Sequence, residues 1–518
     1  MNRSLEVPRG AVIAIRERLS ALACQSERTI MLGAILLASA VSAVTGYVLA
    51  QCFSVDVLSA LLYVPEDCWL NWGTNIGRHC FGDYALVVDP GLRPNPWDPY
   101  PLLLPPDFQP LRTQLPAAAM LPNLLFGLPA KWLGAPRLGL ICYLFALTTA
   151  VVSPAVWAAL GTRGRGRVVV FVAVGAAAIP AWAVIDRGNS VGFIAPIALV
   201  FLVALCRQRW GLVTIMVVLA ALLKPPFVVL AVALLAARQW RWGGLAIVGI
   251  GLSSLAAYLL WPRDFPKTIP QSIHNLFHYG SFFPALVDSS NVSFGRGLLL
   301  LPDAVEASQT GGRIPDSFLA GPRSLIGYAI LALVVVCVLA LGRRLPPVMA
   351  GIVLLATAAL FPPQVHYYYL VFVLPVAALV ARAPGGPPGA GIFDSFAAQG
   401  DRRRAVGIGV SLAAALSIGQ VAVPMLMRIP IFGQFGATGV IGSRLIAWTT
   451  APLTPTLWLV ACAVIVVSYA RTPGLALDGD RGPARAEPPD TVVGTASCSC
   501  ELTAGSSPAT ATVIPPAD

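Results

Sequence analysis

The stretch from Thr29 to Ala50, TIMLGAILLASAVSAVTGYVLA, decides the class of this protein. It contains no charged side chain and matches the roughly 20 apolar residues that an α-helix needs to cross a bilayer. Five arginines precede it: Arg3, Arg9, Arg16, Arg18 and Arg28. Because positive charge stays on the cytoplasmic side of a membrane, residues 1–28 are predicted to be a cytoplasmic segment and the stretch a retained membrane anchor.

Composition extends this interpretation to the whole chain. Of the 518 residues, 57% are apolar and 11% are charged, whereas soluble domains have roughly 45–50% apolar and about 25% charged residues. The apolar runs are continuous, unlike the short alternating strands of a membrane β-barrel. The net charge of +11 resides mainly in arginine clusters beside these runs, so no nucleic-acid partner is implied. The chain is predicted to be an all-α polytopic membrane protein.

We expect about 12 transmembrane helices. After the anchor, the apolar runs lie near residues 137–160, 168–185, 191–206, two shorter helices broken at Lys224, 243–261, 324–341, 348–361, 369–381, 405–424 and 445–470. The run at residues 115–129 is short and interrupted by prolines, and it either spans or re-enters the bilayer. We predict that it re-enters, because re-entry puts every arginine cluster on the cytoplasmic side.

The predicted membrane domain covers residues 29–470 and has two large extracytoplasmic loops, at residues 51–114 and 262–323. Loops of this length usually have a function when they are ordered. Residues 471–518 are rich in Pro, Ala, Thr, Ser and Gly and are predicted to form a disordered cytoplasmic tail. All four histidines fall on the extracytoplasmic side, together with Asp83, Asp186, Asp264 and Asp288.

Most of the ten cysteines are spread singly along the chain. Cys68 and Cys80 lie together in the first outer loop, where an oxidising environment makes a disulfide between them plausible, with Cys52 as a competing partner. His274 and His278 would share one face of a helix but lack a nearby third ligand. We therefore predict no metal site and no cofactor.

Four segments on the predicted outer side carry groups suited to catalysis. Asp83 lies in a loop rich in Gly, Pro and aromatic residues, where a carboxylate could take a proton from an acceptor hydroxyl. Arg187 and Asn189 lie in the sequence Asp-Arg-Gly-Asn-Ser between two spans, where Asn189 could instead serve only as a helix N-cap. Lys224 follows an unbroken apolar run and precedes two prolines, so its ammonium needs an interface, a partner or a polar cavity.

The fourth segment is the sequence Phe361-Pro-Pro-Gln-Val-His-Tyr-Tyr-Tyr at the entry to a late span. The imidazole of His366 near lipid headgroups could donate to a phosphate or carry a proton. Tyr368 and Tyr369 fit an ordinary aromatic belt at the membrane interface. Tyr84 and Tyr367, beside Asp83 and His366, join Asn189 as candidate substrate contacts.

The order of these motifs along the chain resembles the GT-C superfamily of polyprenyl-phosphate-sugar glycosyltransferases, specifically the mannosyltransferase-like members of glycosyltransferase family 87. The similarity runs from about Thr29 to Ala470. The resemblance implies an inverting transferase whose active site faces the extracytoplasmic side of the plasma (inner) membrane. Asp83 matches the catalytic base, Lys224 and Arg187 match positions near the donor phosphate, and His366 matches a polar position of the late span.

The function expected from this resemblance is transfer of a sugar, mannose in the first instance, from a polyprenyl-phosphate donor to a cell-envelope glycan or glycolipid. Membrane lipids are the other expected partner. Two alternatives stay open from the residues themselves. One is a transporter or flippase, since broken helices and a buried lysine also occur in solute pathways. The other is a polymerase or ligase that uses a lipid-linked oligosaccharide.

Overall fold

The architecture comes from a computed structural model of the full chain, which describes residues 25–62, 81–104, 109–279, 286–310, 314–315, 318–432 and 440–472. These residues belong to one compact unit. The predicted N-terminal segment, up to residue 24, and the predicted tail from residue 473 lie outside the described residues. So do Cys68 and Cys80, while Cys52 is an exposed free thiol.

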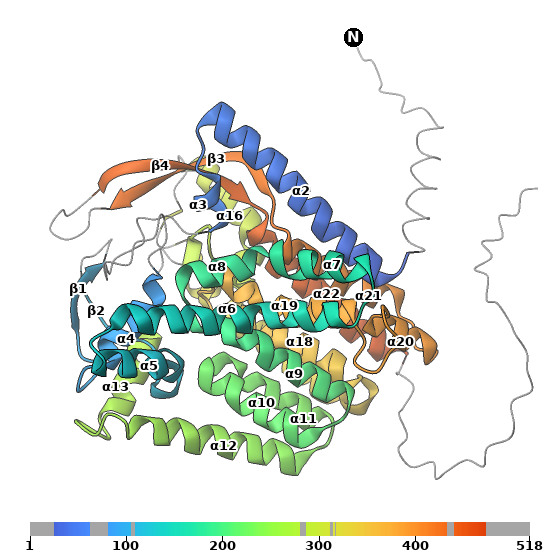
Figure 1. Ribbon diagram of the computed structural model, residues 1–518, viewed down its shortest axis with the longest axis horizontal. Helices are drawn as coiled ribbons and strands as arrows, with labels where there is room; N and C mark the ends of the chain where they lie inside the picture. The colour runs from blue at the N-terminus through green and yellow to red at the C-terminus, as the bar shows by residue number, and fades with distance from the viewer. Residues whose placement is uncertain are drawn as a thin grey trace, which may run out of the picture. The chain divides into compact units, whose positions relative to one another are not determined.

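The described chain is mostly helical (Figure 1). Its first half contains α2 (Glu27–Phe53), α3 (Val57–Leu61), α4 (Gly82–Gly91), α5 (Ala117–Trp132), α6 (Pro136–Leu160), α7 (Arg165–Phe171), η2 (Val172–Ala176), α8 (Ile179–Arg187), η3 (Ser190–Phe193), α9 (Ile194–Cys206), α10 (Trp210–Leu223), η4 (Pro225–Ala231), α11 (Val232–Ala236) and α12 (Trp240–Tyr258). Its second half contains α13 (Thr268–Tyr279), α15 (Phe294–Leu298), α16 (Leu300–Gln309), α17 (Ala320–Leu341), η5 (Gly342–Arg344), α18 (Pro347–Leu360), η6 (Tyr367–Phe372), α19 (Val373–Ala381), α20 (Ile392–Ala398), α21 (Arg404–Ile418), η7 (Ala451–Leu453) and α22 (Thr454–Arg471).

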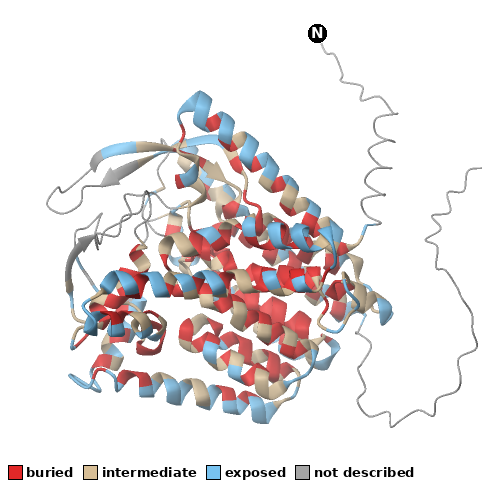
Figure 2. Ribbon diagram, in the orientation of Figure 1, coloured by how far each residue is buried: buried red, intermediate tan, exposed pale blue. Residues whose placement is uncertain are grey.

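Helices α9, α18 and α19 form the centre of the unit. Every residue of α19, and every residue of α18 after Pro347, is buried. A helix that is apolar on all sides is stable where protein surrounds it completely. Around this centre pack α6, α10, α17 and α21, whereas α2 and α12 leave much of their apolar surface exposed (Figure 2).

Apolar helices long enough to cross a bilayer agree with the prediction of an all-α membrane protein. Within the described ranges, four helices meet this length and composition: α2, α6, α17 with η5, and η7 with α22. The pair α7–η2 and α8 adds a fifth if it is one span bent by 46°. Six further apolar segments contain 10–17 residues, among them α10 and α18. The predicted number of about 12 spans therefore requires short or broken helices to cross as well.

The ends of six helices meet at one arginine-rich region, which we call the basic end. Glu27 at the start of α2 pairs with Arg404 of α21 at 2.7 Å, and Arg403 donates to the Ser468 carbonyl of α22 at 2.6 Å. Gly389 donates to the Gly161 carbonyl that follows α6, and Arg207 after α9 donates to the Pro384 carbonyl that follows α19. The arginine clusters that the sequence assigns to one side of the membrane thus share one end of the bundle.

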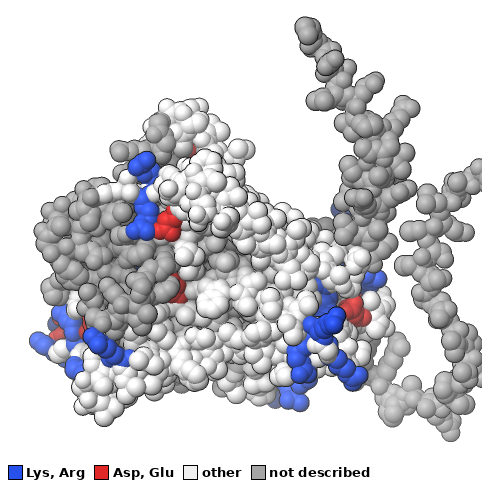
Figure 3. All heavy atoms as spheres, turned by 45° about the horizontal axis from the view of Figure 1, so that its top comes forward, with Lys and Arg blue, Asp and Glu red and all other residues white. Residues whose placement is uncertain are grey.

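The charged side chains of the described residues are unevenly distributed on the surface. On the face drawn in Figure 3, Lys, Arg, Asp and Glu gather toward either side, and a broad band between them carries none. Such a band is expected where lipid surrounds the protein.

Two antiparallel hairpins interrupt the helical architecture. Strands β1 (Tyr100–Leu104) and β2 (Gln109–Leu111) lie in the first outer loop, and β3 (Ala422–Phe432) pairs with β4 (Val440–Thr449) near α2 and α3. The prediction that helical spans cover residues 405–424 and 445–470 was wrong at their facing ends. Pro424 lies in this stretch and Arg428 follows it, and a proline inside a helix costs about 3 kcal/mol.

Candidate functional site

Asp83 lies in the first turn of α4, within the predicted first outer loop. Phe81 caps the helix with φ of 54°, and a carboxylate in the first turn interacts favourably with the positive end of the helix dipole. The Asp83 side chain is only 14% exposed. The local structure therefore holds a largely buried carboxylate in a fixed position.

The turn between α8 and η3 provides both hydrogen-bond donors for this carboxylate. Gly188 ends α8 with φ of 66°, a conformation that glycine adopts without strain. Arg187, the last residue of α8, donates from Nη2 to Asp83 Oδ1 at 2.8 Å. Asn189 donates from Nδ2 to Asp83 Oδ2 at 2.8 Å, while its own Oδ1 accepts from the Val191 amide. Asn189 is therefore both an N-cap and a partner of Asp83.

These contacts determine the protonation state of Asp83. Burial alone raises the pKa of a carboxyl, because it removes the charged form from water. Here the positive charge of Arg187 and the hydrogen bonds from Asn189 and Arg187 outweigh burial, so the pKa of Asp83 lies below its ordinary value. Asp83 is an ionised, oriented carboxylate at neutral pH.

Lys224 lies at the break between α10 and η4, as the two following prolines predict. Its backbone is extended, at φ −145° and ψ 112°, because a residue before proline is driven away from helical angles. The side chain is buried, with Nζ 5.7 Å from the centre of the Tyr369 ring. The ammonium is close enough to interact electrostatically with Asp83.

His366 also lies close enough to Asp83 for their charges to interact. Its ring stacks on Tyr368, which stacks on Tyr369, with both pairs of ring centres 5.4 Å apart. Its Nδ1 lies 3.3 Å from Ser290 Oγ and its Nε2 lies 3.4 Å from the Gln364 amide nitrogen. Burial lowers the pKa of His366, against the charges of Asp288 and Asp83, so the neutral imidazole dominates at pH 7.

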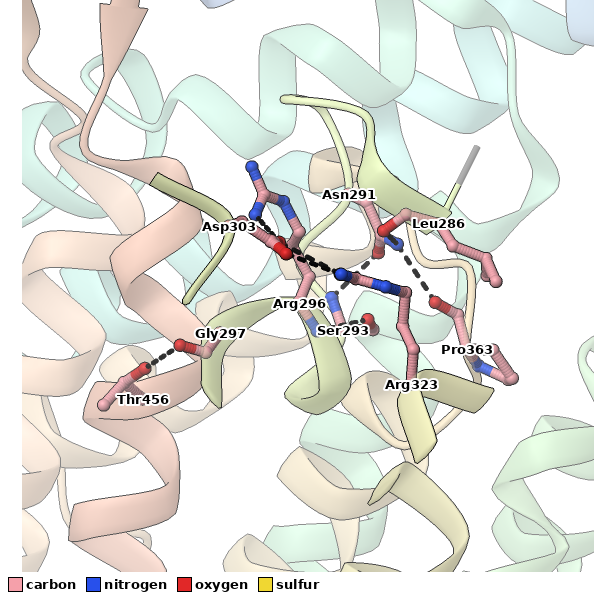
Figure 4. A network of polar contacts seen from close by, with 9 residues as sticks. All are labelled: Leu286, Asn291, Ser293, Arg296, Gly297, Asp303, Arg323, Pro363 and Thr456. Carbon is pink, nitrogen blue, oxygen red and sulfur yellow. Dashed lines mark hydrogen bonds and ion pairs between the residues drawn. The ribbon is translucent and has the colours of Figure 1, made fainter. Parts of the chain in front are cut away.

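The predicted second outer loop fixes the backbone beside His366 (Figure 4). Asn291 donates from Nδ2 to the Pro363 carbonyl at 3.0 Å, and its Oδ1 accepts from the Val365 amide at 3.0 Å. The Val292 amide donates to the Val365 carbonyl at 2.7 Å. Loop residues more than 70 positions away in sequence therefore set the position of His366.

Farther along the second loop, two arginines flank one buried carboxylate. Asp303 of α16 pairs with Arg296 of α15 and with Arg323 of α17, the latter at 2.5 Å. All three side chains are buried (Figure 4). Breaking such a buried ion pair is strongly destabilising. This network fixes the loop to the start of a spanning helix.

Five of the predicted site residues lie together, whereas the two predicted substrate contacts Tyr84 and Tyr367 are buried in packing and backbone contacts. Asp83, Arg187, Asn189, Lys224 and His366 come together. Tyr84 is buried, with its ring centre 4.6 Å from that of Tyr143, and Tyr367 is buried, with its amide donating to the Ser290 carbonyl.

Sequence reasoning missed three features of the site. Tyr369 had the pattern of an interfacial aromatic, and nothing local in the sequence indicates its contact with Lys224. Asn291 and the Arg296–Asp303–Arg323 network were also missed, although charges beside the apolar run at 298–301 were a usable signal. Within the described ranges, no three His, Cys, Asp or Glu side chains gather in a way that could hold a metal ion.

A scan against protein-family models and searches of curated proteins and of solved structures found no match for this chain. The resemblance to the GT-C superfamily thus stays an expectation from sequence motifs.

Proposed function

We propose that this protein is a membrane glycosyltransferase that moves a sugar, mannose in the first instance, from a polyprenyl-phosphate donor to a glycan or glycolipid acceptor. The observation that carries the proposal is the ionised, buried Asp83, which is held by Arg187 and Asn189 and lies near Lys224. A base beside two cations suits a reaction in which a hydroxyl is deprotonated and a phosphate leaves.

The proposed reaction is a single displacement. The Asp83 carboxylate takes the proton of the acceptor hydroxyl as the acceptor oxygen attacks the anomeric carbon. The bond from that carbon to the phosphate oxygen breaks, and polyprenyl phosphate leaves with the electron pair. Attack on the face opposite the leaving group inverts the configuration.

Lys224 and Arg187 would stabilise the negative charge that develops on the leaving phosphate. Both side chains are largely or fully buried, and an ion pair is stronger away from water. His366, held neutral, can donate one hydrogen bond to the same phosphate.

Arg187 also explains how a carboxylate with a low pKa can act as a base. In the absence of donor, Arg187 stabilises the ionised form of Asp83. A donor phosphate competes for this guanidinium, because bidentate arginine–phosphate pairs are strong. When Arg187 binds the phosphate instead, burial raises the proton affinity of Asp83. The carboxylate can then accept the proton of the acceptor hydroxyl.

The same proposal places the protein in the plasma (inner) membrane with about 12 crossings in a GT-C-like arrangement. The basic end would face the cytoplasm by the positive-inside rule, and the Asp83 site would face the extracytoplasmic side. A polyprenyl donor could then reach the site from the bilayer.

The test is transfer of radiolabel in proteoliposomes from polyprenyl-phosphate mannose, then polyprenyl-phosphate arabinofuranose. Asp83→Asn should reduce transfer by about 100- to 10,000-fold, the usual contribution of a general base. The control is Asp264→Asn, which removes a partly exposed carboxylate that accepts a hydrogen bond from Asn95. This variant should transfer at the rate of the unmodified protein.

Two outcomes would contradict the proposal. Near-normal transfer by Asp83→Asn would exclude Asp83 as the base. Failure of the folded, unmodified protein with every single-sugar donor would exclude this transferase function, and oligosaccharide ligation and flux across vesicles would be assayed next.

A further inference from the structure

Helix α13 of the second outer loop has its polarity reversed relative to a helix on a water-facing surface. Its buried side chains are polar, Thr268, Ser272 and Asn275. Its exposed side chains are mostly apolar: Pro270, Ile273, Leu276 and Phe277, with His274 as the polar exception. Phe277 is 70% exposed, whereas Asn275 is 3% exposed. A helix on a soluble protein buries its apolar face and exposes its polar one.

Side-chain amides on the polar face of α13 donate hydrogen bonds inside the protein. Asn275 donates to the carbonyls of Trp97 and Thr113, both at 3.1 Å, and Gln271 donates to Asp98 at 3.0 Å. These contacts fix which face of α13 points outward. The exposed apolar face is therefore imposed by specific hydrogen bonds.

Helix α16 of the same loop has the same reversed polarity through different contacts. Asp303, 2% exposed, points inward to its two arginines, whereas Leu301 and Val305 point outward and are 75% and 49% exposed. Leu298, just before the helix, extends this apolar surface. Two helices of one loop thus face outward with apolar side chains.

We propose that these apolar faces of α13 and α16 contact the acyl chains of the bilayer, so that much of the second outer loop lies in the membrane interface. Neither helix can span: their 12 and 10 residues extend about 18 and 15 Å, against about 30 Å of hydrocarbon. Their lengths and one-sided polarity suit helices lying in the plane of the interface.

The surface adjoining α13 identifies lipid as the occupant. The preceding helix α12, which covers most of the predicted span at residues 243–261, exposes Leu252 and Leu255, and Leu259 just after the helix is exposed as well. Arg263 and Lys267 are exposed in the segment that joins the two helices, at the level where basic side chains meet headgroups. The hydroxyls of Tyr258 at the end of α12 and Ser272 of α13 are hydrogen-bonded, so these two exposed helices adjoin. This lipid contact does not depend on the proposed transferase activity.

Collision accessibility of nitroxide labels tests the proposal in the full chain, reconstituted in nanodiscs after replacement of its natural cysteines. Labels at Phe277→Cys and Leu301→Cys should collide readily with oxygen and poorly with a water-soluble nickel chelate. Leu252→Cys of α12 is the lipid-facing control, and Gln399→Cys, exposed near the basic end, is the aqueous control. The oxygen-to-nickel ratio should exceed that of Gln399→Cys by about an order of magnitude, because the bilayer core excludes the chelate.

If the oxygen-to-nickel ratios at Phe277→Cys and Leu301→Cys equal that of Gln399→Cys, the two helices face water and the proposal is refuted. Low accessibility to both reagents would overturn it in favour of a protein partner covering the helices. If the cysteine-free protein does not fold, the unmodified protein is illuminated with phospholipids that carry a photoactivatable acyl chain. Adducts in α13 and α16 as frequent as those in α12 support the proposal, and their absence refutes it.

Discussion

Replacing Arg187 by methionine should destabilise the protein through Asp83, because it leaves a buried carboxylate without its main counter-charge. Both side chains are 14% exposed and they lie 2.8 Å apart. Removing one partner of a buried pair costs about 3–5 kcal/mol, since the remaining charge stays desolvated. We therefore expect Arg187→Met to unfold at a clearly lower temperature, measured by intrinsic tryptophan fluorescence in detergent.

The double variant Asp83→Asn/Arg187→Met should recover much of this loss, because it no longer buries an unpaired charge. The coupling energy of the cycle should reach about 2–3 kcal/mol, the upper part of the range for residues in direct contact. Strictly additive effects in the three variants would show that the pair does not interact as the geometry requires.

The pH dependence of stability should also have opposite signs in the unmodified protein and in Arg187→Met. In the unmodified protein the pKa of Asp83 is lowered, so its contribution to stability is present above the unfolded-state pKa and is lost as pH falls through the folded-state pKa. Without Arg187, burial dominates and raises that pKa above the unfolded value, so Arg187→Met should gain stability as pH falls from 7 to 5. Parallel pH profiles for the two proteins would refute the assignment.

Two further substitutions test other parts of the site. Lys224→Met should raise the KM for a lipid-phosphate donor by about 10-fold or more, given about 1.5–3 kcal/mol for a hydrogen bond to a charged group. Lys131→Met at the end of α5 is its control, and an unchanged KM in Lys224→Met would refute phosphate binding. Gly327→Ala should cost about 1–3 kcal/mol, because its Cβ would overlap with the Phe361 carbonyl oxygen. Gly321→Ala, in the same helix with open space around it, should leave the unfolding temperature unchanged, and equal effects would contradict this packing.

The parts of the fold that the sequence predicts are those set by local chemistry. The apolar run of α2 and the arginines of the basic end follow directly from transfer energies into lipid. The break at Lys224 follows from the sterics of the prolines that come after it. The glycine after Arg187 predicts a helix end, and the positive φ of Gly188 confirms it.

The parts that the sequence does not predict depend on contacts between distant segments. Tyr369 and Lys224 lie far apart in the chain. The sequence around Tyr369 therefore does not distinguish a tyrosine of the aromatic belt from one that contacts a buried cation. The start of β3 (422–424) and the second half of β4 (445–449) fall in predicted spans, because strands and spans both favour apolar residues. In α16, the rule that polar residues of an outer loop face water fails, because Asp303 finds its partners inside the protein.

The two outer loops connect the lipid-facing helices to the candidate site. In the first loop, Asp98 bonds to Gln271 of α13, while the same loop carries Asp83 on α4. In the second loop, Asn291 fixes the backbone beside His366, and α15 and α16 follow it directly. If α13 and α16 lie in the interface, the depth of the bilayer sets the height of the Asp83 site relative to the headgroups. A donor whose phosphate sits at that height would meet Arg187 and Lys224 with its polyprenyl chain still in lipid, so catalysis would require no extraction of the chain into water.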